Sequence, residues 1–150
     1  MNASSCPPKV PAARSGLPKI LYTEDDTELR LFSTRVLKRK GIEVMPVEDG
    51  LQAWEALDAE KFDLMIVNNE MPWITGLELV ATADREGMDL LIIVASGSAN
   101  ILAMSSEGHC GRWGEAGKDR PALRFLPKPY SPCELARLVK EMLGLSTGEN

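Results

Sequence analysis

Short apolar runs alternate along the chain with longer segments in which apolar residues recur at helical spacing. The apolar runs predict five strands: Lys19–Thr23, Glu43–Val47, Leu64–Asn68, Leu90–Ala95 and Ala122–Leu126. The third and fourth runs are almost wholly apolar, which is typical of strands that helices cover on both faces. Pro46 lies inside the second run and favours an edge strand, because proline cannot donate a hydrogen bond to a neighbouring strand.

Four segments between and after these runs are predicted to be helices: Thr27–Lys40, Gly50–Ala59, Gly76–Glu86 and Ser131–Leu143. The last has the clearest signals, because Ser131 can cap it, Pro132 suits its first position and Glu134 completes a capping box. Glycines at 41 and 87 are plausible stops for the first and third helices.

Apolar spacing predicts which face of each helix is buried. The expected buried positions are Leu29, Phe32 and Val36 in the first helix, Ala53, Ala56 and Leu57 in the second, Leu77, Val80 and Ala81 in the third, and Leu135, Leu138, Val139 and Met142 in the last. Five strands that alternate with helices predict an α/β fold, a doubly wound and mostly parallel sheet with right-handed crossovers.

Two segments lack this alternation. Residues Met1–Pro18 are rich in proline, serine and alanine and predict a flexible tail before a domain that spans residues 19–146. The segment Gly97–Arg120 predicts a short helix around Ala99–Met104 and then a long, glycine-rich loop. We also expect a stand-alone domain with no output domain, because the chain ends soon after the last helix.

Composition narrows the class of protein. The 150 residues carry 17 Lys and Arg against 22 Asp and Glu, a net charge of −5, which argues against direct binding to nucleic acid. No apolar run is long enough to span a membrane and no secretory signal is visible. Three cysteines without a CxxC pair predict a cytoplasmic chain without disulfides, and His109 beside Cys110 is weak support for a zinc site.

Polar side chains follow four of the predicted strands. Three acids at positions 24–26 follow the first strand, Asn68 and Glu70 lie at the end of the third, Ser96 follows the fourth and Lys128 the fifth. In an open α/β sheet, working groups gather outside the carboxyl ends of the strands. Carboxylates suit Mg²⁺, while a lysine and a hydroxyl suit phosphoryl oxygens, so these are the parts of a phosphoryl-transfer site.

Each of these residues also has an ordinary explanation. The three acids are suited to capping the helix that begins near Thr27, because acids are favoured at helix N-termini. Ser96 taken alone is an ordinary loop hydroxyl, and Lys128 alone is an ordinary surface lysine. Their joint placement at successive strand ends is what favours a functional site.

From Pro18 to Leu145 the sequence resembles the receiver domains of two-component response regulators. The resemblance is carried by ILYTEDD, FDLMIVNNEMPWITGLEL, IIVASG and FLPKPYSPCEL, in that order and at matching spacing. It implies a flavodoxin-like receiver fold with strand order 2-1-3-4-5 and a site that takes phosphate from a histidine kinase onto an aspartate.

The resemblance also implies roles for individual residues. Glu24 and Asp25 match the acidic pair that holds Mg²⁺, and Glu70 matches the position whose backbone carbonyl completes the metal site. Ser96 matches the hydroxyl that reorients onto the phosphoryl group, and Lys128 matches the lysine of the site.

Two further positions follow from the same match. Phe125 matches the aromatic switch residue that turns inward on activation. The bond between Lys128 and Pro129 is a candidate cis peptide.

The sequence departs from the family at the centre of this site. The phosphoacceptor position is Asn68, and a carboxamide is a poor oxygen nucleophile that also removes one negative charge from the metal site. Asn68 is either natural, introduced as an Asp→Asn block, or converted to aspartate by deamidation. The neighbouring Asn69, Trp73 and Ile74 are also atypical of the family.

A second departure is the long segment between Ser96 and Lys128, where the family has its fourth helix. Its glycines and Trp113 predict a remodelled face, on which the tryptophan is either a partner anchor or folded back onto the core.

The sequence therefore predicts a receiver-like signalling domain that is impaired in Asp phosphorylation and that acts through protein binding, not as an enzyme. The expected partner is a histidine kinase, a phosphotransfer protein or another regulator. One alternative is a working receiver in which Asp25 or Asp26 takes the phosphoryl group. Another is a Mg²⁺-dependent phosphohydrolase, which the amide at position 68 and the lack of a cap domain disfavour.

Overall fold

The computed structural model describes residues 16–98 and 123–145 and contains the predicted α/β sheet. Its elements are β1 (Lys19–Thr23), α1 (Thr27–Arg39), β2 (Glu43–Val47), α2 (Gly50–Ala59), β3 (Leu64–Asn68), α3 (Gly76–Arg85), β4 (Leu91–Ser96), β5 (Leu123–Pro127) and α6 (Pro132–Leu143). All strand pairs are parallel and the order is β2-β1-β3-β4-β5. The predicted fold class is confirmed, and β2, with Pro46, is an edge strand.

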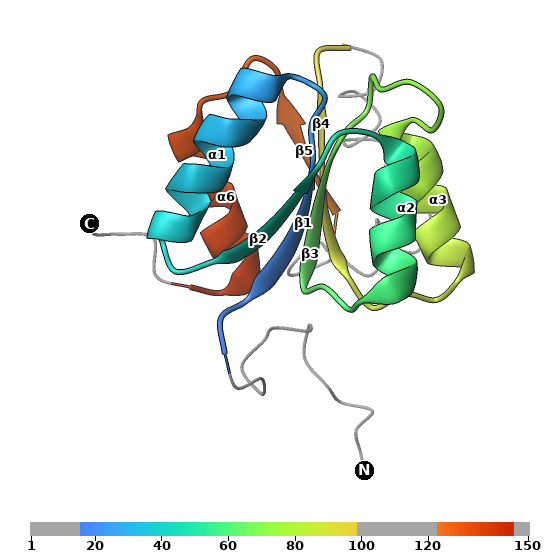
Figure 1. Ribbon diagram of the computed structural model, residues 1–150, viewed down its shortest axis with the longest axis horizontal. Helices are drawn as coiled ribbons and strands as arrows, with labels where there is room; N and C mark the ends of the chain where they lie inside the picture. The colour runs from blue at the N-terminus through green and yellow to red at the C-terminus, as the bar shows by residue number, and fades with distance from the viewer. Residues whose placement is uncertain (1–15, 99–122, 146–150) are drawn as a thin grey trace.

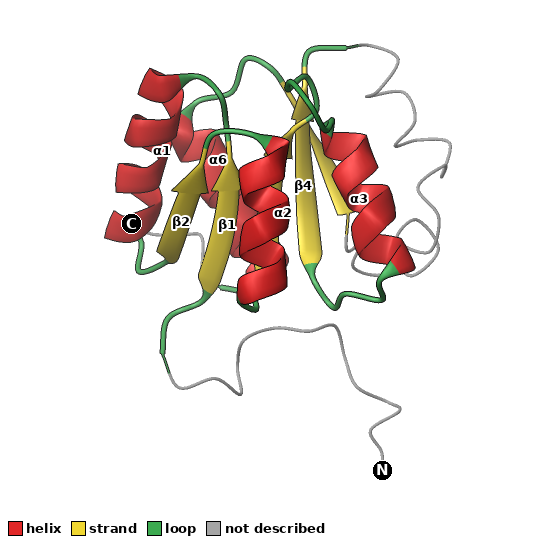
Figure 2. Ribbon diagram, turned by 45° about the vertical axis from the view of Figure 1, so that its right-hand side comes forward, coloured by secondary structure: helices red, strands yellow, loops and turns green. Residues whose placement is uncertain are grey.

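Helices cover both faces of the sheet. α1 and α6 lie together on one face, and α2 and α3 lie on the other (Figures 1 and 2). Each face has its own core: Leu37 of α1 packs with Leu135 and Val139 of α6, whereas Leu57 of α2 packs with Leu79 of α3. β3 and β4 are buried along their whole length, as their apolar composition predicts.

Element boundaries differ from the sequence predictions by one residue in several places. β4 and β5 each begin and end one residue later than predicted, whereas α1 and α3 each end one residue earlier. Ser131 lies outside α6 as its cap, where its hydroxyl accepts a hydrogen bond from the Glu134 backbone at 3.0 Å and the capping box is complete. Differences of one residue are ordinary at the ends of helices and strands, and they leave the order of the elements unchanged.

The predicted buried face is correct for α6, correct for α2 except that Ala56 is only partly buried, and wrong in part for α1 and α3. The predicted α6 positions are all buried, but Phe32 of α1 is 56% exposed while Ser33 is fully buried. The bulky Tyr22 of β1 lies on this face of the sheet, and the small Ser33 is the residue beside it. In α3 the buried positions include Leu79 and Ala83, and Ala81 is exposed.

Several predictions lie outside the described residues. They are the tail up to residue 15, the helix around Ala99–Met104, most of the Gly97–Arg120 loop, His109 with Cys110, and Trp113. Cys133 is exposed with a free thiol. Within residues 16–98 and 123–145, no helix has the length and apolar character needed to cross a membrane.

A close backbone approach fixes the loop between β3 and α3 against the start of α2. A Cβ added to Gly50 would lie 2.6 Å from the carbonyl oxygen of Ile74, and one added to Gly76 would lie 2.9 Å from the Cα of Asn69. Both glycines are buried. The loop that follows Asn68 is therefore held in place by contacts that only glycine permits.

We predict that Gly50→Ala destabilises the domain by about 1–3 kcal/mol, because the added methyl group overlaps backbone that cannot move freely. Chemical denaturation followed by circular dichroism measures the change. The control is Glu55→Ala, an exposed position in the same helix, which should change stability by less than about 0.5 kcal/mol. Equal stability of the two variants would show that the loop yields to the methyl group.

Candidate functional site

Parallel pairing brings the predicted polar residues to one edge of the sheet. Glu24 directly follows β1, Asn68 ends β3, Ser96 ends β4 and Lys128 follows β5. The first three are buried, with exposures of 1%, 2% and 0%. Buried polar groups at a strand edge must be hydrogen-bonded to be tolerated, so their partners define the site.

The amide nitrogen of Asn68 lies between the two acids predicted to hold a metal. Asn68 Nδ2 donates to Asp25 Oδ1 at 2.8 Å and to Glu24 Oε2 at 3.4 Å. Asn68 Oδ1 is buried and has no hydrogen-bond partner among the described residues. The amide nitrogen thus donates to both carboxylates, and the amide oxygen is a buried acceptor without a partner among the described residues.

Glu24 is held at all of its polar atoms. Its Oε1 accepts from the Tyr130 hydroxyl at 3.1 Å, and its Oε2 accepts from the backbone N–H of Asp26 at 3.0 Å as well as from Asn68. Its backbone carbonyl accepts from Arg30 Nη1 at 2.7 Å. Burial raises the pKa of Glu24, and the N–H of Asp26 and the charge of Lys128 oppose that rise.

Two tyrosines extend this network into the core. The hydroxyls of Tyr22 and Tyr130 are 2.8 Å apart, and both side chains are buried. Burial raises the pKa of Tyr22 to about 12 and raises that of Tyr130 as well. Both rings therefore remain protonated donors at neutral pH, which suits a chain of hydrogen bonds that ends on the Glu24 carboxylate.

The expectation that the acids merely cap a helix is correct for one of the three. Asp26 is the N-cap of α1, and its Oδ1 accepts from the Leu29 backbone at 3.0 Å. Glu24 is buried instead, and Asp25 is exposed beside Asn68. One acid therefore starts the helix, while the other two face the amide.

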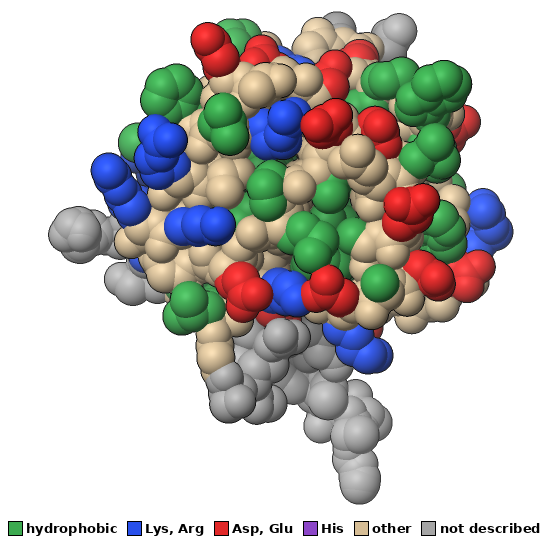
Figure 3. All heavy atoms as spheres, viewed as in Figure 1, with side chains coloured by type: hydrophobic (Ala, Val, Ile, Leu, Met, Phe, Trp, Pro, Cys, Tyr) green, Lys and Arg blue, Asp and Glu red, His purple; other side chains and the backbone are tan. Residues whose placement is uncertain are grey.

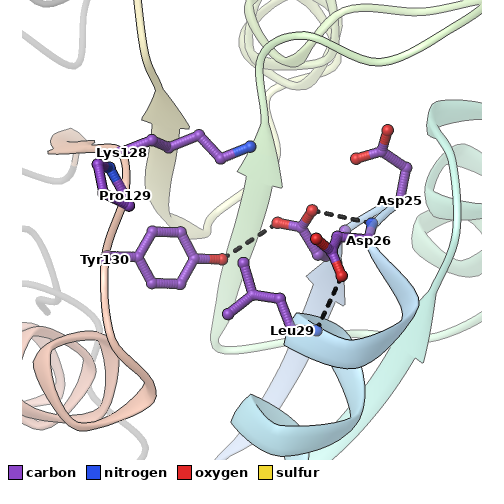
Figure 4. A pocket seen from close by; sticks show the side chains of 7 residues that line it. Asp25, Asp26, Leu29, Lys128, Pro129 and Tyr130 are labelled. Atoms are coloured by element: carbon purple, nitrogen blue, oxygen red, sulfur yellow. Dashed lines mark hydrogen bonds between the residues drawn. The ribbon is translucent and has the colours of Figure 1, made fainter.

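A pocket of about 490 Å³ opens beside these groups. Its lining consists of Glu24, Asp25, Asp26, Leu29, Lys128, Pro129 and Tyr130. Figure 4 shows Lys128 extending across it from the side of Pro129 toward that of Asp25. The bond between Lys128 and Pro129 is cis, as predicted, and the Lys128 N–H donates to the Ser96 carbonyl at 3.0 Å.

The side chain of Glu70 bonds to the end of β4. The Ser96 hydroxyl donates to Glu70 Oε2 at 2.5 Å, and the Gly97 N–H donates to Glu70 Oε1 at 3.5 Å. These bonds, with the attraction of Lys128 and a bond from Asn69, outweigh partial burial and lower the pKa of Glu70. The metal role predicted for the Glu70 backbone carbonyl stays a prediction.

Two aromatic residues lie close in sequence to site residues, one on β5 and one in the β3–α3 loop. Phe125, the predicted switch residue, is partly buried and packs against the core on the α2 and α3 face of the sheet. Trp73 follows the site in the β3–α3 loop, is 76% exposed and has a backbone φ of 73°. That left-handed backbone is uncommon for a residue with a side chain and is held by the fixed loop around it.

Sequence reasoning missed Tyr22, Tyr130 and the side-chain role of Glu70. Tyr22 lies inside the predicted strand Lys19–Thr23, and a hydroxyl in a buried strand needs a partner. Tyr130 lies two residues after Lys128, and this spacing is enough to predict that its side chain lies near the site. Which partners these hydroxyls find depends on the crossing of separate strands and is not encoded in local spacing.

The donor set fits a hard cation only in part. Within residues 16–98 and 123–145, no three His, Cys, Asp or Glu side chains are grouped to hold a metal ion. Glu24, Asp25 and the free Oδ1 of Asn68 nevertheless offer the oxygen atoms that Mg²⁺ prefers. A bound cation requires the Asn68 amide to turn its oxygen toward the acids, because its N–H groups face them here.

Comparison with known proteins gives relatives along most of the chain. The sequence profile of the response regulator receiver domain matches residues 20–140. The response regulator receiver protein CpdR of Brucella abortus is 30% identical over 125 residues, which cover 83% of this chain and 96% of that protein. The DNA-binding transcriptional regulator NtrC of Azospirillum brasilense is 29% identical over 128 residues, which are 85% of this chain but 24% of that longer protein.

Solved structures share the fold. The receiver domain of the Francisella response regulator 1452 superimposes with a TM-score of 0.68 at 21% identity, covering 85% of this chain and 97% of that one. The response regulator TrrA of Thermotoga maritima, solved in complex with Mg²⁺-BeF, gives a TM-score of 0.66 at 24% identity and covers 85% of this chain and all of its own.

We predict that Tyr130→Phe destabilises the domain more than Tyr22→Phe does. Loss of the Tyr130 hydroxyl removes a partner from both Glu24 and Tyr22, and a buried group left unpaired costs about 1–3 kcal/mol. Loss of the Tyr22 hydroxyl leaves the bond from Tyr130 to Glu24 intact. Denaturant titration of both variants measures the difference, and the opposite order would contradict the network described above.

Proposed function

The chain belongs to the response regulator receiver family of two-component systems, and we propose that it signals through protein binding without phosphorylation of its own strand-end site. The observation that carries the proposal is Asn68, the last residue of β3, which is buried and donates to both neighbouring acids. An amide so engaged has no ionised oxygen with which to attack a phosphoryl donor.

The partners of Asn68 support this reading more strongly than its identity alone. A carboxylate at this position would lie beside Glu24 and Asp25 as a third like charge, and a cation would be needed to hold the three together. The amide instead stabilises the pair by donating hydrogen bonds to them. In the proposed resting state, the Asn68 amide therefore takes the place of a cation between the two acids.

Exposed apolar side chains on α1 support the protein-binding part of the proposal. Leu31 is 55% exposed and Phe32 is 56% exposed, with the Arg35 guanidinium 6.0 Å from the Phe32 ring centre. The last turn of the same helix carries Lys38 and Arg39, and Figure 3 shows basic side chains gathered on this side of the molecule. Such a mixed apolar and basic face suits an acidic surface on a kinase, a phosphotransfer protein or another regulator.

We propose that Mg²⁺ binds weakly at Glu24 and Asp25, with the Glu70 carbonyl as the third protein ligand. The solved TrrA complex contains Mg²⁺-BeF. In this chain Asn68 contributes no charge to such a site, and its N–H groups compete with a cation for the same carboxylate oxygens. The protein is then a binding module and not a catalyst.

The first test of the proposal is exposure to a small-molecule acyl phosphate, followed by intact mass spectrometry. We expect the natural chain to gain no phosphoryl group and the Asn68→Asp variant to gain one that hydroxylamine removes. The reason is that only the variant has a carboxylate at the end of β3.

A labile phosphoryl group on the natural chain would overturn the proposal. Asp25→Ala and Asp26→Ala variants would then locate it. Of these two acids Asp25 is the better acceptor, because the Asp26 carboxylate already caps α1.

The second test measures Mg²⁺ affinity by NMR titration. Asn68→Asp should bind Mg²⁺ about tenfold more tightly than the natural chain or better, because it adds a charged oxygen ligand, and tenfold corresponds to about 1.4 kcal/mol. Asn69→Asp is the matched control, since it adds the same charge at the next residue, whose side chain instead accepts from the Leu77 backbone. Equal gains in the two variants would show a general charge effect and not a ligand at position 68.

A further inference from the structure

Donors from the end of β4 and from Asn69, which follows β3, converge on the Glu70 carboxylate. Glu70 receives the Ser96 hydroxyl on Oε2 and the Gly97 backbone N–H on Oε1, at 2.5 Å and 3.5 Å. The Asn69 amide donates to Oε2 at 3.4 Å. Ser96 is fully buried, so its hydroxyl is aimed at this acceptor and not at solvent.

This arrangement has the chemistry of an anion-binding cradle. A hydroxyl, a backbone N–H and an ammonium group together favour a ligand with two or three negatively charged oxygens. Lys128 supplies the positive charge: its backbone N–H is bonded to Ser96, and its charge lowers the pKa of Glu70. The donors of the cradle are therefore already bonded to a carboxylate of the chain itself.

We propose that the Glu70 carboxylate is the built-in ligand of this cradle, standing where a free or covalently attached phosphoryl group would bind. The proposal rests on the function proposed above. In a chain that is not phosphorylated, no phosphoryl group accepts hydrogen bonds from Ser96 and Gly97, and the Glu70 carboxylate accepts them instead. Glu70 links the β3–α3 loop to the end of β4, so one conformation of both loops is fixed by the chain itself.

The position of Glu70 in the fold supports this role. It lies two residues after Asn68, in the loop that glycine contacts hold against α2. The Ser98 N–H donates to Ser96 Oγ at 3.0 Å, so the same hydroxyl connects Glu70 to the first residues of the next segment. Removal of the carboxylate should therefore change the environment of the Gly97 and Ser98 backbone amides as well as that of residue 70.

The experiment compares the natural chain with Glu70→Gln and Glu70→Ala by amide NMR. The control is Glu55→Gln, which removes the same charge from an exposed position on α2. We expect the amide signals of Ser96, Gly97 and Ser98 to shift in both Glu70 variants and to stay unchanged in the control.

Titration with inorganic phosphate then tests whether the cradle binds an anion once it is vacated. Glu70→Ala should show saturable shifts at Gly97 with an affinity about tenfold higher than the natural chain, which is the size expected for uncovering charge-assisted hydrogen bonds. Glu55→Gln should behave as the natural chain does.

Two outcomes would overturn the inference: unchanged Ser96, Gly97 and Ser98 signals in the Glu70 variants, or phosphate binding at Gly97 that is equal in the natural chain and in Glu70→Ala. Neither outcome depends on phosphoryl transfer. A phosphoryl group on the natural chain would instead contradict the proposed function, so the two failures are distinguishable.

Discussion

The carboxyl edge of this sheet depends on how one buried amide is partnered. The Asn68 nitrogen carries two N–H groups and faces two carboxylates, Glu24 and Asp25, so it satisfies both without a counter-ion. Asn68 is 2% exposed, so solvent cannot easily take over this task. Without these donors or a cation, the buried Glu24 carboxylate would be repelled by the neighbouring exposed Asp25, and its ionised form would be disfavoured. The amide therefore allows both acids to lie at the sheet edge beside the start of α1.

Glu24 connects a residue at the end of β3 with one that follows β5, because its side chain is one methylene longer than that of an aspartate. Its two carboxylate oxygens reach different elements: Oε2 meets Asn68 at the end of β3 and Oε1 meets Tyr130 after β5. Tyr130 in turn meets Tyr22 inside β1. Three strand ends are thereby joined through one side chain, and burial, which raises the pKa of both tyrosines, further favours the protonated hydroxyls of this chain of bonds.

Apolar runs predicted the five strands, and the rule that parallel strands end on one side predicted the edge at which Glu24, Asn68, Ser96 and Lys128 meet. The strand order was implied by the family resemblance and not by spacing. The buried face of α1 was mispredicted at Phe32, because a stripe of apolar residues does not say how a helix is rotated against a bulky neighbour such as Tyr22. The bonds of Glu70 and Tyr130 were likewise beyond local spacing, since each joins elements far apart in sequence.

The two networks at this edge are complementary. Near β1, the Asn68 amide donates hydrogen bonds to two acids that would otherwise favour a bound cation. Near β4, the Glu70 carboxylate accepts hydrogen bonds from donors that would otherwise favour a bound anion. Lys128 is shared, because its charge acts on both Glu24 and Glu70. The two networks therefore lie at one edge of the sheet, close enough to the same positive charge for it to favour the ionised form of both carboxylates.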